Sequence, residues 1–373
     1  MTLTIYLDTQ DYIALFNEHP EGPHHQVLAT LLARRDRGEI AIGFSFATIM
    51  EFITKPDDAH RSKRVRRGQL VKDICGRNAF PFPSAMANFT AFSNDGMWMI
   101  NPGESFISAR ECRKLIRNAY MDALKDMREL NRHQRRNYGR KSSMIDLMNK
   151  VGYTWGNKRS DWGDLPVSDE IIHSEIMERF IRGQCSDKEF EDRINSWLSD
   201  PAEFSKIFYE YGDQPNMIEK FFGNITSYME QTATDLQDLV SEIRRCNSAI
   251  LGTRQRLVAE GMEKSEARRL TKQISLPSMK SRALDGKRKT DFGETFTSHF
   301  AHYLERILKL EHTFKKSDVM DLFQLCYAYD CDLFRCDKAM ANTFRDFRPL
   351  QGKLVEQFSE LPQRMEAIIG ASE

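Results

Sequence analysis

The chain has 373 residues, and its 54 Lys and Arg side chains balance 54 Asp and Glu side chains, so the formal net charge is zero. Hydrophobic residues make up 40% and aromatic residues 10%, which is enough for a large core and excludes disorder throughout. The longest largely apolar stretch, residues 40–50, is far shorter than the ~20 residues that cross a bilayer. The first residues do not resemble a secretory signal. We therefore expect a soluble cytoplasmic protein without a membrane partner.

Opposite charges are segregated along the chain. Residues 110–141 and residues 254–289 each contain 11 basic and 4 acidic side chains, whereas residues 161–240 contain 18 acids and 6 bases. Basic blocks are typical of surfaces that bind polyanions, although solvated helix faces give the same pattern. The candidate phosphate contacts in the first block surround Tyr138, whose ring could stack on a base. They are Arg128, Arg132, Arg135, Arg136 and Arg140.

The first part of the chain has the alternation of a parallel sheet. Residues 3–7 are predicted to form a strand that ends at Asp8, and residues 11–37 a helix that is interrupted near Pro20 and Pro23. A second strand is expected over residues 38–44. Ser45 then follows as a candidate cap for a helix that carries Glu51. Strand, helix, strand and helix in succession indicate a βαβ unit.

Helical periodicity dominates the next two hundred residues. Ser186 and Asp200 are placed as helix caps, and residues 217–246 predict one long helix. Helices are then expected at 296–310 and 318–329, and strands at 332–336 and 354–355.

These elements predict an α/β fold with a parallel sheet built from both chain ends. The two parts of that domain are residues 1–79 and 291–373, and a mostly α-helical domain is inserted at residues 80–290. Because ligands of open parallel sheets bind beyond the carboxyl ends of the strands, acids placed there are candidate site residues. Asp8 and Asp337 each follow a predicted strand.

Three further acids lie on helices of the same domain. Glu51 follows the second strand, and Asp318 and Asp321 lie three residues apart on one helix face. Clustered carboxylates repel one another unless a cation neutralises them, and oxygen ligands favour Mg²⁺ or Mn²⁺. Ions held in this way can activate a water for phosphodiester hydrolysis.

The order of these acids resembles that of the PIN-domain nucleases. Leu7-Asp8-Thr9 is similar to the first strand and acid of the family, and residues 45–52 to the helix with its second acid. Residues 317–329 and 332–338 resemble the helix with the third acid and the strand before the fourth. The resemblance implies a PIN-like, Rossmann-like fold and a metal-dependent nuclease, with RNA favoured over DNA as substrate. The implied ligands of Mg²⁺ or Mn²⁺ are Asp8, Glu51, Asp321 and Asp337, with Asp318 as an additional or alternative third acid.

Two residues depart from the family pattern. Gln10 stands where an asparagine is common, and Arg335 stands where a small hydroxyl residue is common. Arg335 could weaken metal binding or hold a phosphate, and Lys338 is a second candidate phosphate contact near Asp337. The alternative hypothesis is therefore a catalytically degenerate PIN-like module for binding or assembly, with the helical insertion as a surface for a protein partner. The sequence does not distinguish a toxin or defence effector from a processing enzyme.

Other catalytic motifs are weaker. Asp8-Thr9-Gln10 lacks the Asp-x-Asp of haloacid dehalogenases, and the chain has neither a P-loop nor a Gly-x-Ser-x-Gly elbow. His299 and His302, with Glu305, could face one side of a helix as metal ligands, but without a second ligand helix they are better interpreted as packing or surface residues.

Overall fold

The computed structural model describes residues 2–54, 62–81, 98, 108–126, 133, 169–211, 225–274, 292–309, 314–315 and 317–370. The chain divides into two compact units. The first comprises Met1–Ala47, Pro83–Phe92 and Phe222–Glu373, and the second comprises Thr48–Phe82 and Ser93–Phe221. Both ends of the chain thus belong to one unit, although the predicted domains have other boundaries, at residues 79 and 290.

The first unit contains a sheet of four parallel strands in the order β2-β1-β3-β4. This finding confirms the predicted α/β fold class and the pairing of strands from opposite ends of the chain. Each strand lies within a predicted one. The strands are β1 (Leu3–Tyr6), β2 (Ile40–Gly43), β3 (Leu333–Arg335) and β4 (Leu354–Val355).

Aromatic packing supports the central pair of strands. Tyr6 is aligned with Phe334 in the parallel register, and their rings stack with centroids 4.7 Å apart. The Tyr6 ring is completely buried, and its hydroxyl forms a 2.8 Å hydrogen bond with the hydroxyl of Ser45, just beyond β2. The buried hydroxyl therefore has the partner that its loss of hydration requires, and the bond ties the ends of β1 and β2 together.

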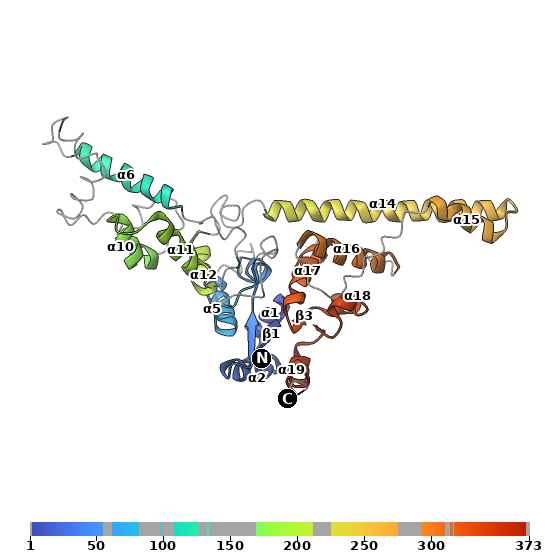
Figure 1. Cartoon of the computed structure of the whole chain (residues 1–373), viewed down its shortest axis with the longest axis horizontal. Helices are drawn as coiled ribbons and strands as arrows, with labels where there is room; N and C mark the ends of the chain where they lie inside the picture. The colour runs from blue at the N-terminus through green and yellow to red at the C-terminus, as the bar shows by residue number, and fades with distance from the viewer. Residues whose placement is uncertain are drawn as a thin grey trace. The chain divides into compact units, whose positions relative to one another are not determined.

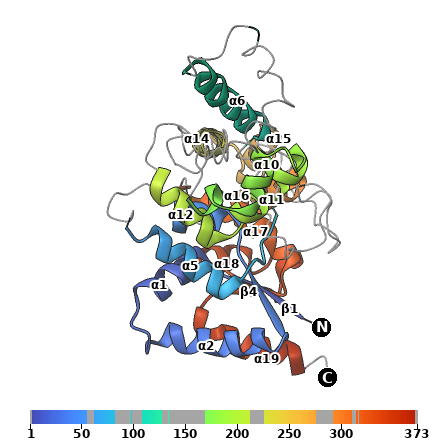
Figure 2. The ribbon, with the colours of Figure 1, turned by 90° about the vertical axis from the view of Figure 1, so that its left-hand side faces the viewer.

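Helices surround this sheet. The last helix, α19, packs against α2 near the N-terminus, as Figures 1 and 2 show. The helices of the first unit are α1 (Thr9–Asn17), α2 (Pro23–Asp36), α14 (Ile225–Ala259), α15 (Lys264–Ile274), α16 (Phe292–Lys309), α17 (Ser317–Leu325), α18 (Lys338–Phe344) and α19 (Leu361–Gly370), with 3₁₀ segments η4 (Cys326–Asp330), η5 (Arg348–Leu350) and η6 (Phe358–Glu360).

The predicted long helix corresponds to α14, but its predicted end at Cys246 is wrong. The helix continues to Ala259. Apolar residues recur beyond Cys246 at Ile250 and Leu257, and α15 packs against this extension. One glycine in the extension, Gly252, costs only about 1 kcal/mol relative to alanine and does not end the helix.

The described part of the second unit is helical. Its elements are η1 (Ile49–Ile53, a π-helix), α5 (Arg64–Cys75), α6 (Ala109–Asp126), α9 (Asp169–Ile172), α10 (Glu175–Ile181), α11 (Asp187–Leu198) and α12 (Pro201–Tyr211), and α3 (Phe46–Thr48) spans the boundary between the units. Both predicted caps are confirmed. The Ser186 hydroxyl accepts from the N–H of Glu189 at 3.1 Å, and the Asp200 carboxylate accepts from the N–H of Ala202 at 2.9 Å. No helix among the described residues is long and apolar enough to span a bilayer.

The contact between α5 and α12 in the second unit depends on a glycine. At Gly68 in α5, a Cβ atom would lie 2.5 Å from the carbonyl oxygen of Pro201 and would also overlap the Ser205 side chain of α12. We expect Gly68→Ala to lower the free energy of unfolding by about 1–3 kcal/mol, because the two helices would have to separate. Urea denaturation would measure this loss. Gly252→Ala on α14, where a Cβ meets nothing within 4 Å, is the matched control and should not destabilise the protein.

Candidate active site

Asp8 and Asp337 lie at the same edge of the sheet. They follow β1 and β3, which are adjacent and parallel, with Tyr6 aligned with Phe334. Neighbouring strands are about 5 Å apart, so the register brings these two acids from opposite ends of the chain together. Each also caps a helix. The Asp8 carboxylate accepts from the N–H of Gln10 at 3.0 Å, and the Asp337 carboxylate accepts from the N–H of Met340 at 2.6 Å.

The environment of Asp8 disfavours its negative charge. Burial raises the pKa of the Asp8 carboxyl, and the nearby negative charge of Asp337 raises it further. The N–H of Gln10 and the guanidinium of Arg335 oppose this rise. A carboxylate whose ionised form is destabilised by burial and by a neighbouring negative charge provides a place where an added cation would be favourable.

Asp11 is a buried acid beside this pair. Only 2% of the residue is exposed. Its carboxylate accepts from the N–H of Asp8 at 3.1 Å and lies 3.2 Å from a guanidinium nitrogen of Arg335. Burial raises the pKa of Asp11 to about 7, with Arg335 opposing and Asp8 reinforcing the rise. The contacts therefore make Asp11 a partner for Arg335 and a support for the backbone at Asp8.

Arg335 is largely buried, whereas a phosphate contact is usually exposed. Its side chain is 12% exposed, it pairs with Asp11, and it also donates to the carbonyl of Cys336. Its role as a phosphate contact stays a prediction, and it would require the Asp11 pair to open. Lys338, at the first position of α18, is exposed and remains a candidate for that role.

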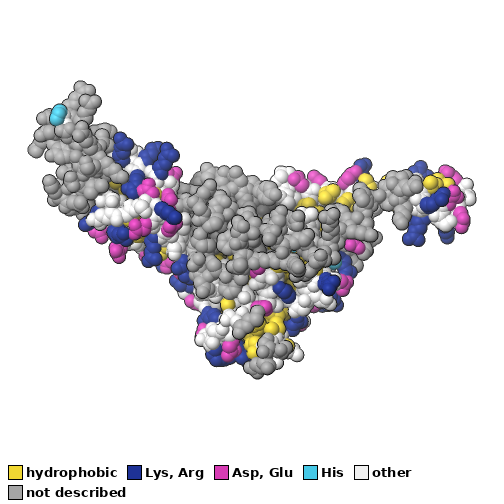
Figure 3. Space-filling view, viewed as in Figure 1, with side chains coloured by type: hydrophobic (Ala, Val, Ile, Leu, Met, Phe, Trp, Pro, Cys, Tyr) yellow, Lys and Arg dark blue, Asp and Glu magenta, His cyan; other side chains and the backbone are white. Residues whose placement is uncertain are grey.

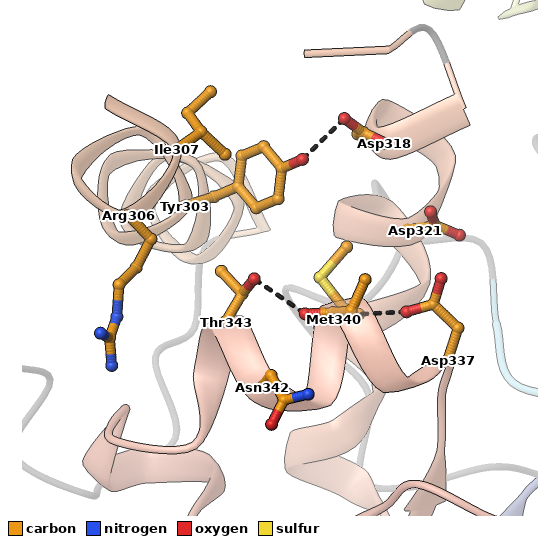
Figure 4. A pocket seen from close by; sticks show the side chains of 10 residues that line it. Tyr303, Arg306, Ile307, Asp318, Asp321, Asp337, Met340, Asn342 and Thr343 are labelled. Carbon is orange, nitrogen blue, oxygen red and sulfur yellow. Dashed lines mark hydrogen bonds between the residues drawn. The ribbon is translucent and has the colours of Figure 1, made fainter. Parts of the chain in front are cut away.

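A cavity of about 290 Å³ adjoins Asp337. Asp318 and Asp321 of α17 and Asp337 line one side, and residues of α16 line the other (Figure 4). The two predicted third acids and the predicted fourth acid thus share one cavity, as their spacing on a helix and after a strand implied. The complete lining comprises Tyr303, Arg306, Ile307, Asp318, Asp321, Asp337, Ala339, Met340, Asn342 and Thr343.

Asp318 is held by two donors. The Tyr303 hydroxyl donates to its carboxylate at 2.6 Å, and the N–H of Lys315 donates to the same oxygen at 2.8 Å. Asp318 is 8% exposed, whereas Asp321 is half-buried. Burial and the bond to Asp318 raise the pKa of Tyr303 above its ordinary range, so this hydroxyl stays a donor. The arrangement fixes Asp318 in position and leaves Asp321 as the more accessible of the two.

For two groups of predicted site residues, the position relative to this site stays a prediction. Glu51 is half-buried on η1 of the second unit, so its place beside the other acids stays a prediction. The arginines of the first basic block lie outside the described residues: Arg128, Arg132, Arg135, Arg136 and Arg140.

Two residues of the site were not predicted. Asp11 completes a capping box with Asp8, and the Asp-x-x-Asp spacing is a signal that could have identified it. Tyr303 reaches Asp318 from another helix, and no local spacing in the sequence indicates that contact.

The chemistry of the donors fits Mg²⁺ or Mn²⁺ better than a softer metal, because all are carboxylates. Within the described residues, however, no three His, Cys, Asp or Glu side chains are arranged to hold one ion. Mg²⁺ commonly keeps several waters and uses one or two protein carboxylates. The residues that would hold it are therefore Asp8 and Asp337, with Asp321 on the same side of the cavity as Asp337.

Comparisons of this chain with protein-family models, curated proteins and solved structures found no match.

The two histidines of α16 are packing residues. His299 is buried against the rings of Tyr329, Phe344 and Phe347. His302 forms a 3.0 Å hydrogen bond with the carbonyl of Thr343. These contacts agree with the interpretation that the sequence favoured.

Burial of His299 predicts acid sensitivity. Desolvation lowers its pKa to about 3, so the folded protein binds no proton there while the unfolded chain does so below about 6.5. Stability from this residue is present above pH 6.5 and is lost as pH falls. Between pH 6.5 and 5, wild type should lose about 2 kcal/mol more than His299→Phe. Urea denaturation at both pH values tests this. Equal losses in the free energy of unfolding of the two proteins would show that other residues cause the acid sensitivity.

Proposed function

We propose that the chain is a PIN-like, metal-dependent nuclease that hydrolyses phosphodiester bonds, with RNA as its favoured substrate. The observation that carries the proposal is the meeting of Asp8 and Asp337 beyond two adjacent parallel strands, beside a cavity that Asp318 and Asp321 also line. Acids at this edge of a sheet lie where open α/β folds bind their ligands.

The acids would act through a divalent cation. Asp8 and Asp337 would hold Mg²⁺ or Mn²⁺, with Asp321 beside them, and the bound ion would supply a lower pKa for a water and charge stabilisation for the leaving oxygen. Asp318, whose carboxylate accepts the hydrogen bond of Tyr303, would hold α17 in position beside the cavity. Asp11 and Arg335 would hold Asp8 in place through the backbone N–H of Asp8 and their ion pair.

The raised pKa of Asp8 adds a requirement. Its carboxyl must be ionised to accept a cation, so binding would release a proton wherever Asp8 is partly protonated. Calorimetric titration with Mn²⁺ in two buffers of different ionisation enthalpy would measure this release. We expect a saturable site, with affinity that falls as pH decreases.

A degenerate binding module is the second candidate. The buried pair of Arg335 and Asp11 already places a fixed positive charge beside Asp8, which can reduce the need for a metal ion. In this case, Mn²⁺ would give no saturable heat, while binding of a partner would continue without any cation.

Cleavage of end-labelled single-stranded RNA and DNA tests the proposed activity. We expect RNA fragments with Mn²⁺ or Mg²⁺ and none with EDTA. Asp321→Asn, purified in the same way, controls for a contaminating nuclease and should be inactive. Cleavage that persists in EDTA would refute the metal mechanism. Equal cleavage by Asp321→Asn would show that the activity does not come from this site, and intact substrate with a saturable Mn²⁺ site would refute the nuclease assignment.

A further inference from the structure

Helix α14 exposes an apolar stripe. On α14, Leu239 is 43% exposed, and Leu236, Ile243, Ile250 and Leu257 are half-buried. Figure 3 shows hydrophobic and acidic side chains side by side at the surface of the α14 region. Exposed apolar residues that gather on one element commonly mark an interaction surface.

The stripe follows a heptad. Leu236, Ile243, Ile250 and Leu257 recur every seven residues, and Leu239 and Cys246 each lie three residues after a member of that series. These are the a and d positions of a coiled coil, in which helices pair along a shared apolar seam. The heptad of α14 therefore predicts a second helix along this seam.

Among the described residues, contacts within the chain cover one flank of the seam. Ala233 and Val240, at e positions, are buried, and Arg254, also at e, donates to the Thr271 hydroxyl of α15 at 3.0 Å. The g positions on the opposite flank are exposed, including Asp235 and Arg256. The seam is therefore accessible from the g side.

Charge is divided between the halves of α14. Residues 225–243 contain four acids and no Lys or Arg, whereas residues 244–259 contain four arginines and no acid. Two parallel copies of such a helix would place like charges together. Two antiparallel copies would place the acidic half of each against the basic half of the other, which favours that orientation.

We propose that two copies of this chain associate through antiparallel pairing of their α14 helices. In antiparallel coiled coils, an a residue of one helix packs beside a d residue of the other. Pairing Ile243 with Cys246 of the other copy also pairs Ile250 with Leu239, and it puts the symmetry axis between residues 244 and 245. That axis is within one residue of the position where the charge changes sign. The same alignment brings Asp235 near Arg256 of the other copy.

Crosslinking through Cys246 tests the pairing directly. Cys246 lies next to the proposed axis and is half-buried, whereas the other six cysteines are buried. A short bismaleimide should convert the native full-length protein to a covalent dimer in wild type but not in Cys246→Ser. Ile243→Glu with Ile250→Glu should abolish both the crosslink and the dimer mass in sedimentation equilibrium. Ser248→Glu, on the opposite exposed face of α14, should change neither, and circular dichroism should show equal helix content in all variants.

Charge reversal tests the orientation. Asp235→Arg and Arg256→Asp should each weaken the dimer about tenfold, because two symmetry-related contacts become repulsive. The two substitutions combined should restore wild-type affinity. A chain that remains monomeric at its highest soluble concentration would overturn the proposal. A dimer that Ile243→Glu with Ile250→Glu leaves intact, or one in which the combined charge reversal does not restore affinity, would overturn it as well.

Discussion

Asp8→Asn and Asp337→Asn should each lower the rate of RNA cleavage by about 10³-fold or more, because each removes a negative charge from the proposed cation site. The substitutions keep the size and shape of the side chains. The effect should therefore fall on the rate constant of cleavage and on the affinity for Mn²⁺ rather than on folding. Single-turnover cleavage of labelled RNA measures the first, and calorimetry measures the second.

The fold should survive these substitutions because asparagine is as good a helix N-cap as aspartate. Both acids are caps, of α1 and α18, and an Asn side-chain oxygen can accept the same backbone N–H. Thermal unfolding should therefore be nearly unchanged. Asp36→Asn, at the end of α2 and away from the cavity, is the control and should retain full activity. Cleavage at the wild-type rate in either active-site variant would remove that acid from the mechanism.

Arg335→Met should lower the free energy of unfolding at pH 8 by about 1–3 kcal/mol, because the buried Asp11 carboxyl loses its cation and must take up a proton in the folded state. The loss should be smaller at pH 5. Without Arg335, the folded-state pKa of Asp11 rises further above its unfolded value, so the protonated form is stable at low pH and the stability is lost as pH rises. Urea denaturation of the metal-free protein at both pH values measures the difference.

A matched double substitution separates the lost charge pair from a packing defect. Arg335→Met with Asp11→Asn replaces both charges, and it should recover most of the stability at pH 8 because no buried charge is left unpaired. Equal destabilisation by Arg335→Met at pH 5 and pH 8, or no recovery in the double variant, would show that packing of the arginine stem accounts for the loss.

The strands of the sheet could be predicted because the residues within each strand indicate it. Apolar strands such as residues 3–7 and 332–336 end at acids, and the parallel fold then brings Asp8 and Asp337 to one edge. The predicted end of α14 at Cys246 is wrong although the sequence holds a signal for the longer helix. Ile250 and Leu257 continue the apolar heptad beyond Cys246.

The parts of the site that escaped prediction depend on tertiary contacts. Tyr303 meets Asp318 only after α16 and α17 pack, and the burial of Asp11 against Arg335 requires β1 and β3 to be adjacent. In the sequence, the charge of Arg335 suggested a phosphate contact. Its ion pair with Asp11 became visible only in the fold. Glu51 lies in the second unit, so its place beside the other acids stays a prediction.

Anomalous diffraction from crystals soaked in Mn²⁺ tests the central claim most directly. The account predicts a manganese peak about 2.1–2.2 Å from carboxylate oxygens of both Asp8 and Asp337, at the mouth of the cavity that Asp321 lines. The peak should disappear in crystals of Asp337→Asn. A map without a peak near these acids, or one with manganese bound only elsewhere on the chain, would contradict a metal centre formed by the two ends of the polypeptide.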